Sequence, residues 1–298
     1  MNRRTFIRQA AGTTGALAML SNASAHELLA PVMRPVGLQL YTLFGVIEQD
    51  VPGYLKKIAG FGYTELESAF SRLPGYYGMS PKEFKALAEQ NGLHWKSHHV
   101  LGTPFVPPPG VTIPPNMPKM RTLKDNTPEL VTEATEGGVK YLVCANINTS
   151  SADNIKSSIE ILNKTGEECK KAGLILAYHN HDAEFKTVEG VVPYDEFLSK
   201  LTPDIKMELD LAWVAKAGVD PVEIFKKAPG RFPIWHVKDF DKDFKTLMPV
   251  GKGVIDFKRI FDNASLAGLD IPFVEHDNPP NAMESIETSI TYLKTTLK

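Results

Sequence analysis

The sequence lacks the features that mark several large classes of protein. Among 298 residues it has only two cysteines, Cys144 and Cys169, which are too few for a disulfide framework. It also lacks a basic excess: Lys and Arg number 33, Asp and Glu number 35, and the formal net charge is −2. Nucleic acid and anionic membrane surfaces are therefore not the expected partners. With 43% hydrophobic and 23% charged residues, the composition is that of an ordinary globular protein.

Long hydrophobic runs are absent as well. The apolar stretch over residues 10–20 is shorter than the roughly 20 residues that span a bilayer. It follows the positively charged start Arg3-Arg4-Thr5-Phe6-Ile7 and precedes Ala23-Ser24-Ala25, which has the pattern of a signal-peptide cleavage site. The Arg-Arg-x-Phe-Ile core resembles a bacterial twin-arginine export signal. The alternative is an amphipathic N-terminal helix of the fold.

We expect residues 1–25 to be a signal peptide, residues 26–34 a lead-in, and the mature protein to be periplasmic. Cleavage would remove Arg3, Arg4 and Arg8 and no acidic residue, so the formal charge of the mature protein becomes about −5. We expect no stable insertion into a membrane. A homo-oligomer is compatible with the sequence.

Short apolar runs rich in β-branched and aromatic residues recur from residue 35 to the C-terminus. Their length of about five to seven residues is typical of buried strands. Signatures of helix starts lie between them, such as Ser80-Pro81-Lys82-Glu83 and Asp220-Pro221-Val222-Glu223. This alternation predicts a single (β/α)8 TIM barrel over residues 35–298. The alternative is a doubly wound open sheet, but the first run lacks a glycine-rich phosphate-binding turn. The eight runs are Val36–Tyr41, Tyr63–Glu67, His94–Val100, Lys140–Ala145, Leu174–His179, Ile205–Leu211, Pro233–Val237 and Ile271–Glu275.

One connection is unusually long. Residues 103–118 are rich in proline and follow the third predicted strand. Loops after the strands of a barrel lie on its catalytic face, so we expect this segment to form part of a pocket rim.

Charged residues and histidines gather where the predicted strands end, which is where barrel enzymes carry their active sites. Asp210, His236 and Glu275 come from three consecutive strands and could converge on one divalent cation, with His179 as a fourth ligand. Mixed carboxylate and imidazole ligands favour Mn²⁺, with Mg²⁺, Co²⁺ and Zn²⁺ as alternatives. Each residue also has a structural interpretation: Asp210 as a helix cap, His236 as a core histidine, and Glu275 as a partner of Lys238.

Five motifs at these strand ends resemble those of one family. The sequence from residue 35 to 298 resembles the xylose isomerase-like barrels, also called sugar phosphate isomerases/epimerases. The resemblance implies a divalent metal, usually Mn²⁺, held at His179, Asp210, His236 and Glu275. Many members have Glu where this chain has His179, so the two-glutamate proton shuttle of the family's epimerases does not carry over directly. The motifs are Tyr178-His179-Asn180-His181-Asp182, Leu209-Asp210-Leu211-x-Trp213, His236-Val237-Lys238-Asp239, Gly251-x-Gly253-x-Ile255-Asp256 and Val274-Glu275-x-Asp277.

Two histidines, His179 and His181, are candidates for the ligand from the fifth strand. Successive side chains of a strand point to opposite faces, so both face inward only if the strand ends between them. The Gly251-Lys252-Gly253 segment after the seventh strand is either an anion-binding turn or, as we favour, a tight turn before a helix capped by Asp256.

The expected reaction begins when the metal chelates a carbonyl and a neighbouring hydroxyl of a sugar, which acidifies the adjacent C–H. A base then removes the proton to give an enediolate, whose fate is isomerisation, epimerisation or elimination. We expect a carbohydrate substrate. Alternatives are a lyase, dehydratase or hydrolase of 3-keto sugars or glycosides, an apurinic-site type endonuclease, and a non-catalytic sugar-binding barrel. The candidate proton carriers are Glu275, Glu67, His181 and Lys238, and the candidate substrate contacts are His99, Trp213 and Asp239.

Overall fold

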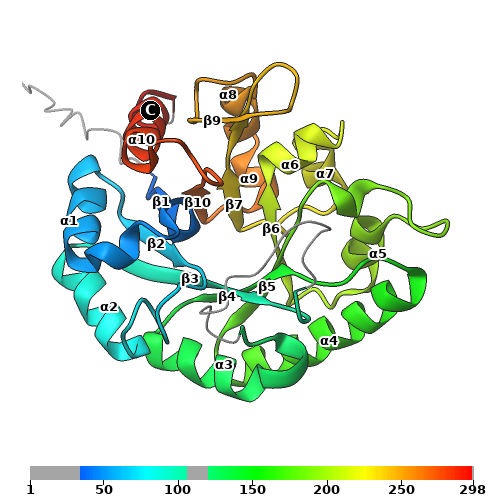
Figure 1. Cartoon of the computed structure of the whole chain (residues 1–298). Coiled ribbons are helices and arrows are strands. Elements are labelled where there is room, and N and C mark those ends of the chain that lie inside the picture. Colours follow the sequence, from blue (N-terminus) through cyan, green and yellow to red (C-terminus); the bar gives the residue numbers. More distant parts are fainter. Residues whose placement is uncertain (1–33, 106–119, 297–298) are drawn as a thin grey trace, which may run out of the picture. The chain divides into compact units, whose positions relative to one another are not determined.

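Eight parallel strands close into a barrel in the computed structural model, which describes residues 34–105 and 120–296 (Figure 1). The order around the barrel is β1-β10-β7-β6-β5-β4-β3-β2, so each strand lies beside its neighbour in the chain and the last closes onto the first. The (β/α)8 barrel is confirmed, and the open sheet is wrong. The strands are β1 Gly37–Gln39, β2 Glu65–Ser68, β3 His94–Leu101, β4 Tyr141–Asn146, β5 Ile175–His179, β6 Lys206–Asp210, β7 Ile234–Val237 and β10 Ile271–Val274.

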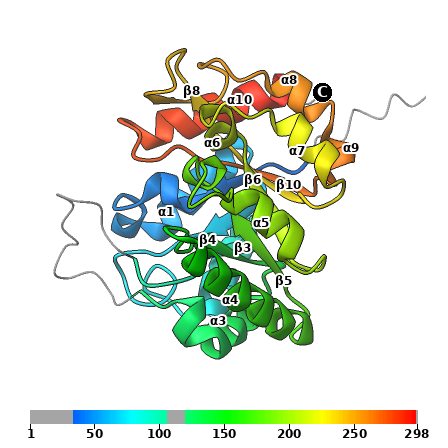
Figure 2. The same cartoon turned by 90° about the vertical axis from the view of Figure 1, so that its right-hand side faces the viewer.

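Helices surround the barrel and cover the outer faces of its strands. Figure 2 shows α3, α4 and α5 along the outer side of β3, β4 and β5. Because both faces of the sheet are buried, several strands, such as β4 and β10, read as nearly continuous apolar runs, as is typical of a parallel sheet. None of the described helices is long and apolar enough to cross a membrane. The helices are α1 Val51–Phe61, α2 Pro81–Gln90, α3 Leu123–Gly137, α4 Ala152–Lys171, α5 Pro193–Lys200, α6 Leu211–Lys216, α7 Pro221–Lys227, α8 Phe257–Phe261, α9 Ala264–Ala267 and α10 Ala282–Thr296.

The helix starts at Ser80 and Asp220 have the expected caps, whereas the helix that the sequence predicts to open at Thr127-Pro128 begins earlier, at Leu123, with Thr122 as its cap. At α2, Ser80 accepts a hydrogen bond from the backbone N–H of Glu83, whose carboxylate accepts one from the backbone of Ser80. At α7, the carboxylate of Asp220 accepts the N–H of Val222 at 2.9 Å. These caps fix where the chain leaves the loops that follow β2 and β6.

The irregular parts of the barrel lie mainly in the loops that follow the strands. Short 3-10 helices follow β1 and β5, namely η1 Leu40–Leu43, η2 Ile47–Gln49 and η3 Ala183–Phe185, and a two-stranded hairpin of β8 Asp239–Phe240 and β9 Leu247–Met248 follows β7. Residues 106–119, the core of the predicted pocket-rim loop, lie outside the described residues, as does the predicted signal peptide. Cys144 and Cys169 are both buried and free.

Candidate active site

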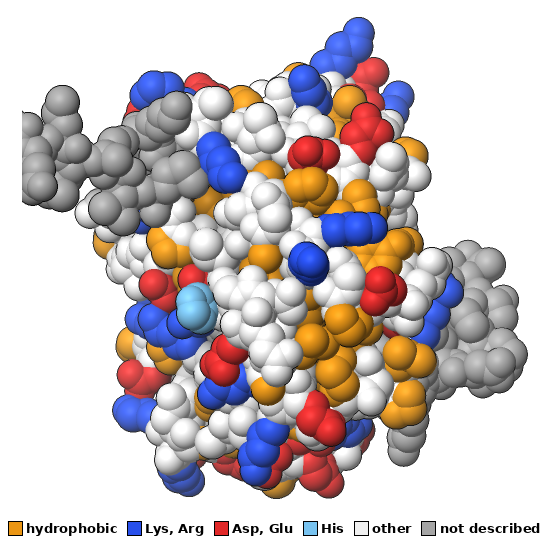
Figure 3. All heavy atoms as spheres, turned by 90° about the vertical axis from the view of Figure 1, so that its left-hand side faces the viewer, with side chains coloured by type: hydrophobic (Ala, Val, Ile, Leu, Met, Phe, Trp, Pro, Cys, Tyr) orange, Lys and Arg blue, Asp and Glu red, His pale blue; other side chains and the backbone are white. Residues whose placement is uncertain are grey.

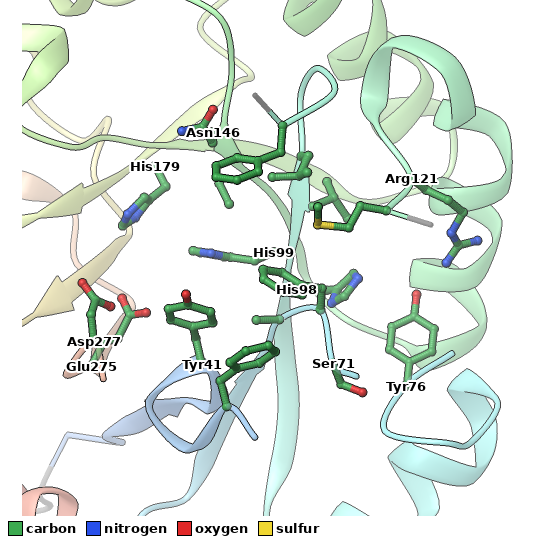
Figure 4. A pocket seen from close by; sticks show the side chains of 18 of the residues that line it. Tyr41, Ser71, Tyr76, His98, His99, Arg121, Asn146, His179, Glu275 and Asp277 are labelled. Carbon is green, nitrogen blue, oxygen red and sulfur yellow. The ribbon is translucent and has the colours of Figure 1, made fainter. Parts of the chain in front are cut away.

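A cavity of about 640 Å³ opens at the carboxyl ends of the strands. Figure 4 shows His179, Glu275 and Asp277 on one side of it, Arg121 and Tyr76 on the opposite side, and Tyr41 and His99 between them. The lining thus combines a polar end, formed by residues that follow β5 and β10, with an apolar end near the loops after β1 and β2. A large concave pocket with a few convergent polar groups is the usual form of a small-molecule site.

Three oxygen and nitrogen atoms at the polar end converge without hydrogen-bond partners. They are Oδ2 of Asp210, Nδ1 of His236 and Oε2 of Glu275, all buried and all within 4.8 Å of one another. Nδ1 of His236 lies 2.5 Å from Oε2 of Glu275 and 4.0 Å from Oδ2 of Asp210. The ammonium of Lys238 lies 2.7 Å from Oε2 of Glu275 and 3.2 Å from Oδ2 of Asp210, so these oxygens are ion-paired but not hydrogen-bonded. Buried polar atoms are nearly always hydrogen-bonded, so three that converge without a hydrogen bond are consistent with an additional ligand there.

Asp210 is both the cap of a helix and a member of this group. Its Oδ1 accepts the backbone N–H groups of Ala212 and Trp213 at 3.0 and 2.9 Å and so begins α6. Its Oδ2 makes no hydrogen bond, although the ammonium of Lys238 lies 3.2 Å from it. The structural and functional interpretations of this residue are therefore compatible.

His179 and His181 are placed differently. His179 is the last residue of β5, is 3% exposed, and directs Nε2 towards Oδ2 of Asp210 at 4.0 Å. The side chain of His181 is 36% exposed, and its ring packs edge-on against that of His179. Both residues line the cavity, because β5 ends between them. Only His179 reaches this group of converging atoms, which favours it as the ligand from the fifth strand.

Two buried carboxylates lie beneath the histidines and bind their other ring nitrogens. Oε2 of Glu208 is 3.0 Å from Nδ1 of His179 and 2.6 Å from Nε2 of His99. Oε1 of Glu67 is 2.5 Å from Nε2 of His236 and accepts the side-chain N–H of Gln39 at 2.9 Å. Histidines that hold a metal usually donate the second ring N–H to a carboxylate in this way.

Glu67 was predicted to carry a proton to or from the substrate, and its position argues against that role. It is fully buried, and its second oxygen accepts the hydroxyl of Ser97. It does not line the cavity, so substrate does not reach it. Orientation of His236 fits this position better than catalysis does. His99 lies at the floor of the cavity, between Glu67 and Glu208.

Lys238 is the cation of the polar end. Its ammonium nitrogen lies 2.7 Å from Oε2 of Glu275, 3.2 Å from Oδ2 of Asp210 and 3.0 Å from Oδ2 of Asp277. The residue is 2% exposed and faces the cavity. Burial lowers the pKa of Lys238, but the carboxylates of Asp210, Asp277 and Glu275 outweigh it and hold this pKa well above the usual value. Lys238 therefore stays charged.

The histidines divide into two electrostatic types. Burial lowers the pKa of His99, but Glu67 and Glu208 raise it to about 9 overall. The pKa of His236 is raised well above its usual value against the effect of burial, because Glu208, Glu275 and Glu67 surround it. Burial, and then the positive charges of His236, His181 and His99, lower the pKa of His179 well below its usual value. His179 is therefore the neutral imidazole of the group.

The residues at the polar end fit a divalent cation. Two imidazole nitrogens and two carboxylate oxygens, from His179, Asp210, His236 and Glu275, border one place, and three of these four atoms make no hydrogen bond. A second group, His99, His179, Glu208 and His236, also has ligand atoms within 4.8 Å, but its members already bind one another through Glu208. The first group fits a metal better, and its mixture of ligands suits Mn²⁺, Zn²⁺ or Co²⁺.

Two other predicted substrate contacts lie away from the cavity lining. Asp239 is buried, and its two oxygens accept four backbone N–H groups, those of Phe240, Gly251, Gly253 and Ile255, at 2.9–3.2 Å. This carboxylate holds the Gly251-Lys252-Gly253 turn, so the turn binds Asp239 and is not a free anion site. The ring of Trp213 packs edge-on against Phe240 and lies near Lys238, at 5.5 Å from its Nζ.

Three residues of the site were missed from the sequence. Glu208 stands two positions before Asp210 on the same strand, so the alternation of side chains could have placed both inside the barrel. Asp277 is two positions after Glu275, but β10 has ended there and strand alternation no longer applies. Tyr41 belongs to a 3-10 helix whose direction no local pattern predicts.

Solved structures of other proteins share this fold. Two proteins described as sugar phosphate isomerase/epimerase from Parabacteroides distasonis are similar: one is 28% identical, with a TM-score of 0.73, and covers 91% of this chain and 97% of its own. The other is 25% identical, with a TM-score of 0.74, and the match covers 89% of this chain and 100% of the other protein's chain. The IOLI protein, solved with a zinc atom, is 16% identical with a TM-score of 0.65 over 88% and 98% of the chains, which shows the fold alone.

No curated protein matches the sequence significantly. Residues 55–296, however, match the family described as xylose isomerase-like TIM barrel. The match extends from α1 to the end of α10 and includes the carboxyl ends of β2 to β10, where the polar end of the cavity lies. Together with the closed barrel and the convergent His, Asp and Glu side chains, this match shows that the chain belongs to the xylose isomerase-like TIM barrel family.

Proposed function

We propose that this protein is a divalent-metal-dependent isomerase or epimerase of a sugar or sugar derivative. The observation that carries the proposal is the convergence of Oδ2 of Asp210, Nδ1 of His236 and Oε2 of Glu275, which make no hydrogen bonds, beside a cavity. The two sugar phosphate isomerases/epimerases from Parabacteroides distasonis support the substrate class. When bound by His179, Asp210, His236 and Glu275, the metal would polarise a carbonyl and lower the pKa of the neighbouring C–H.

The residues of this chain supply the proton transfer. Lys238 and His236 outweigh burial and lower the pKa of Glu275, so its carboxylate is ionised and can accept a proton from the carbon next to the carbonyl. Lys238 stays charged beside it and can donate a hydrogen bond to the negative oxygen that forms. His181, whose ring packs against that of His179, also lines the cavity and could return a proton.

A lyase, dehydratase or hydrolase of 3-keto sugars or glycosides is the second candidate. Position 179 holds a histidine, so β5 offers no carboxylate for the second face of the substrate. The Lys238–Asp277 pair lines the cavity and could protonate a departing group, since Nζ lies within 3.2 Å of both oxygens of Asp277. After proton removal, loss of the substituent two carbons away would replace proton return.

Hydrogen exchange in D₂O tests both candidate functions, the isomerase or epimerase and the lyase. The metal-loaded mature protein is incubated with aldoses, ketoses and 3-keto glycosides, and the C–H signals are followed by NMR. Deuterium incorporation with a new sugar supports the isomerase or epimerase, and release of a substituent supports the lyase. The matched control is Glu275→Gln, which should abolish both. Absence of exchange and of release from every sugar would contradict the proposal.

We further propose that the enzyme acts outside the cytoplasm, in the periplasm, on a small carbohydrate, after removal of residues 1–25. The twin-arginine pattern at Arg3-Arg4 supports this location. Nucleic acid is a poor alternative substrate: on the side of the molecule in Figure 3, Lys and Arg side chains are interspersed with Asp and Glu. Mass spectrometry of the secreted protein would test the cleavage site, and an N-terminus at Met1 would contradict it.

A further inference from the structure

Exposed apolar side chains are concentrated at the apolar end of the cavity. Four large hydrophobic side chains are exposed among the described residues, namely Phe70, Leu73, Phe105 and Val254. The first three all line the cavity, and Val254 does not. Figure 3 shows hydrophobic side chains gathered between charged ones on one side of the molecule. Contiguous exposed apolar surface next to a pocket usually marks a binding surface.

Three aromatic rings form one wall of this end. Tyr41 and Phe44 stack at 5.5 Å between centroids, Phe44 meets Phe70 edge-on at 5.3 Å, and Tyr41 meets Phe70 at 5.7 Å. We call Tyr41, Phe44 and Phe70 the aromatic wall. The guanidinium of Arg72 lies 4.9 Å from the centre of the Phe44 ring, which helps to hold that ring in place.

The aromatic wall is continuous with the polar end of the cavity. Figure 4 shows Tyr41 between the Glu275–Asp277 pair and the apolar side chains. Burial, and then the negative charges of Asp277 and Glu275, raise the pKa of Tyr41, which agrees with its closeness to both carboxylates. A molecule that bound at Glu275 and was longer than one sugar ring would therefore contact the wall.

A flat apolar group suits the wall better than a second sugar ring does. Hydroxyl groups that leave water need hydrogen-bond partners, and Phe44, Phe70 and Leu73 offer none. Ser71 lines the cavity beside them, and its hydroxyl already donates to the carbonyl of Leu73 at 3.1 Å. A flat apolar group needs no such partners and can stack on aromatic rings.

Resting on the proposed function, we propose that the aromatic wall is the subsite for an aromatic aglycone, and hence that the substrate is a keto derivative of an aryl glycoside, whose ring ketone supplies the carbonyl that the reaction needs. The sugar lies at Glu275 and Lys238, and the aglycone lies against Tyr41, Phe44 and Phe70. The cavity volume of about 640 Å³ agrees with a ligand of this size, because drug-sized ligands occupy pockets of about 300–1,000 Å³.

The test is binding of matched glycosides to the metal-loaded protein by titration calorimetry. Phenyl and methyl glycosides of the same pyranoses, such as glucose, galactose and xylose, are compared in pairs. In at least one pair the phenyl glycoside should bind about tenfold more tightly than the methyl glycoside. Phe70→Ala should remove most of that preference, and Phe70→Leu should keep part of it. Val254→Ala, a change at the exposed apolar residue outside the cavity, should leave it intact.

The outcomes separate this inference from the proposed function. Equal binding of both members of every pair, or no binding of any pair, overturns the aglycone subsite, whereas exchange of free sugars in D₂O would still support the proposed function. A second copy of the chain is the other occupant that could cover the wall. If Phe70→Ala lowered the association state in sedimentation and left the phenyl preference unchanged, the wall would be an interface and the inference would be wrong.

Discussion

Nδ1 of His236 lies 2.5 Å from Oε2 of Glu275 without making a hydrogen bond to it, although the ammonium of Lys238 lies 2.7 Å from the same oxygen. Both atoms border one buried place. Oδ2 of Asp210 points to the same place, 4.0 Å from Nδ1. The other nitrogen of His236 is held by Glu67. The ring is therefore fixed between the carboxylate of Glu67 and those of Glu275 and Asp210, whose charge Lys238 balances and a metal could share.

The two groups of potential ligands predict different effects of mutation on metal affinity. Asp210→Asn should remove measurable binding of one equivalent of Mn²⁺ or Zn²⁺, because it takes away a ligand oxygen. Glu208→Gln should weaken binding by about 10–100-fold, because it only orients His99 and His179. Metal content and chelator competition measure both. Asp182→Asn, at a partly exposed carboxylate paired with Lys186, is the control. A greater loss of metal affinity for Glu208→Gln than for Asp210→Asn would place the metal in the second group, formed by His99, His179, Glu208 and His236.

Glu275 should be needed for turnover and not for folding. Glu275→Gln keeps the shape of the side chain but loses the negative charge that accepts a proton, so activity should fall by about a hundredfold to ten-thousandfold. His236→Ala should have a comparable effect. Circular dichroism should show an intact barrel in both variants. Cys144→Ser, at a buried free thiol away from the cavity, should leave turnover nearly unchanged. Near-normal rates in Glu275→Gln would remove that residue from the mechanism.

The barrel and the ends of its strands could be predicted from the sequence, because both depend on local patterns. Apolar runs of strand length and capped helix starts predict the eight strands. The set His179, Asp210, His236 and Glu275 followed from the position of each residue at the end of a strand. The depth at which each side chain lies within the barrel could not be predicted, because it depends on strand register and on side-chain direction. Glu67, one position before the end of β2, therefore lies below the cavity, with its carboxylate on His236.

Contacts between loops that are distant in the chain could not be predicted from the sequence either. Asp239 stands beside Lys238 in the chain, yet its carboxylate turns away to bind Gly251, Gly253 and Ile255. The aromatic wall joins residues from the loops after β1 and β2, and no local periodicity brings Tyr41 to Phe70. Such contacts are set by the packing of loops on the closed barrel.

Lys238 should stabilise the metal-free protein by balancing three carboxylates. Lys238→Met would leave Asp210, Glu275 and Asp277 without their shared cation in a buried site. The free energy of unfolding should fall by about 3–5 kcal/mol in the presence of EDTA. Added metal should restore part of this loss, because it binds only the folded state.

Urea unfolding with and without metal measures the effect of Lys238→Met. Lys216→Met is the control, since Lys216 is an exposed cation over the ring of Trp213 and should contribute only about 0.5–1 kcal/mol. If Lys238→Met were as stable as the wild type in EDTA, the balancing role would be refuted.

The interior of the barrel leaves no room for a side chain at Gly37. A Cβ atom there would lie 2.2 Å from Cδ1 of Phe273, on the neighbouring strand β10. Gly37→Ala should destabilise the protein by about 1–3 kcal/mol, and the smaller Phe273→Leu should relieve part of that loss in the double variant. Gly60→Ala is the matched control, because its Cβ would meet nothing within 4 Å and lies inside α1. That change should be neutral or stabilising by up to about 1 kcal/mol. Thermal melts of the four variants measure the difference.

His98 should make the stability of the protein sensitive to acid. It is buried beside the aromatic core, and Ser68, which accepts the indole N–H of Trp95 at 2.8 Å, lies 2.7 Å from its Nδ1 and can donate its hydroxyl to it. Burial, and then the positive charges of His99 and Arg121, lower the pKa of His98 to about 3. In the unfolded chain the pKa of a histidine is about 6.5. Between these values only the unfolded state binds the proton, so the free energy of unfolding falls as the pH falls.

The size of this effect can be measured with a variant that does not titrate. From pH 7 to pH 5, protonation of His98 in the unfolded state should cost the wild type about 2 kcal/mol of stability. His98→Asn keeps an acceptor for the Ser68 hydroxyl and has no titrating group. Its free energy of unfolding, measured in urea at both pH values, should therefore fall by about 2 kcal/mol less than that of the wild type. Equal losses in the two proteins would show that His98 takes up its proton without unfolding, and that burial does not hold it neutral.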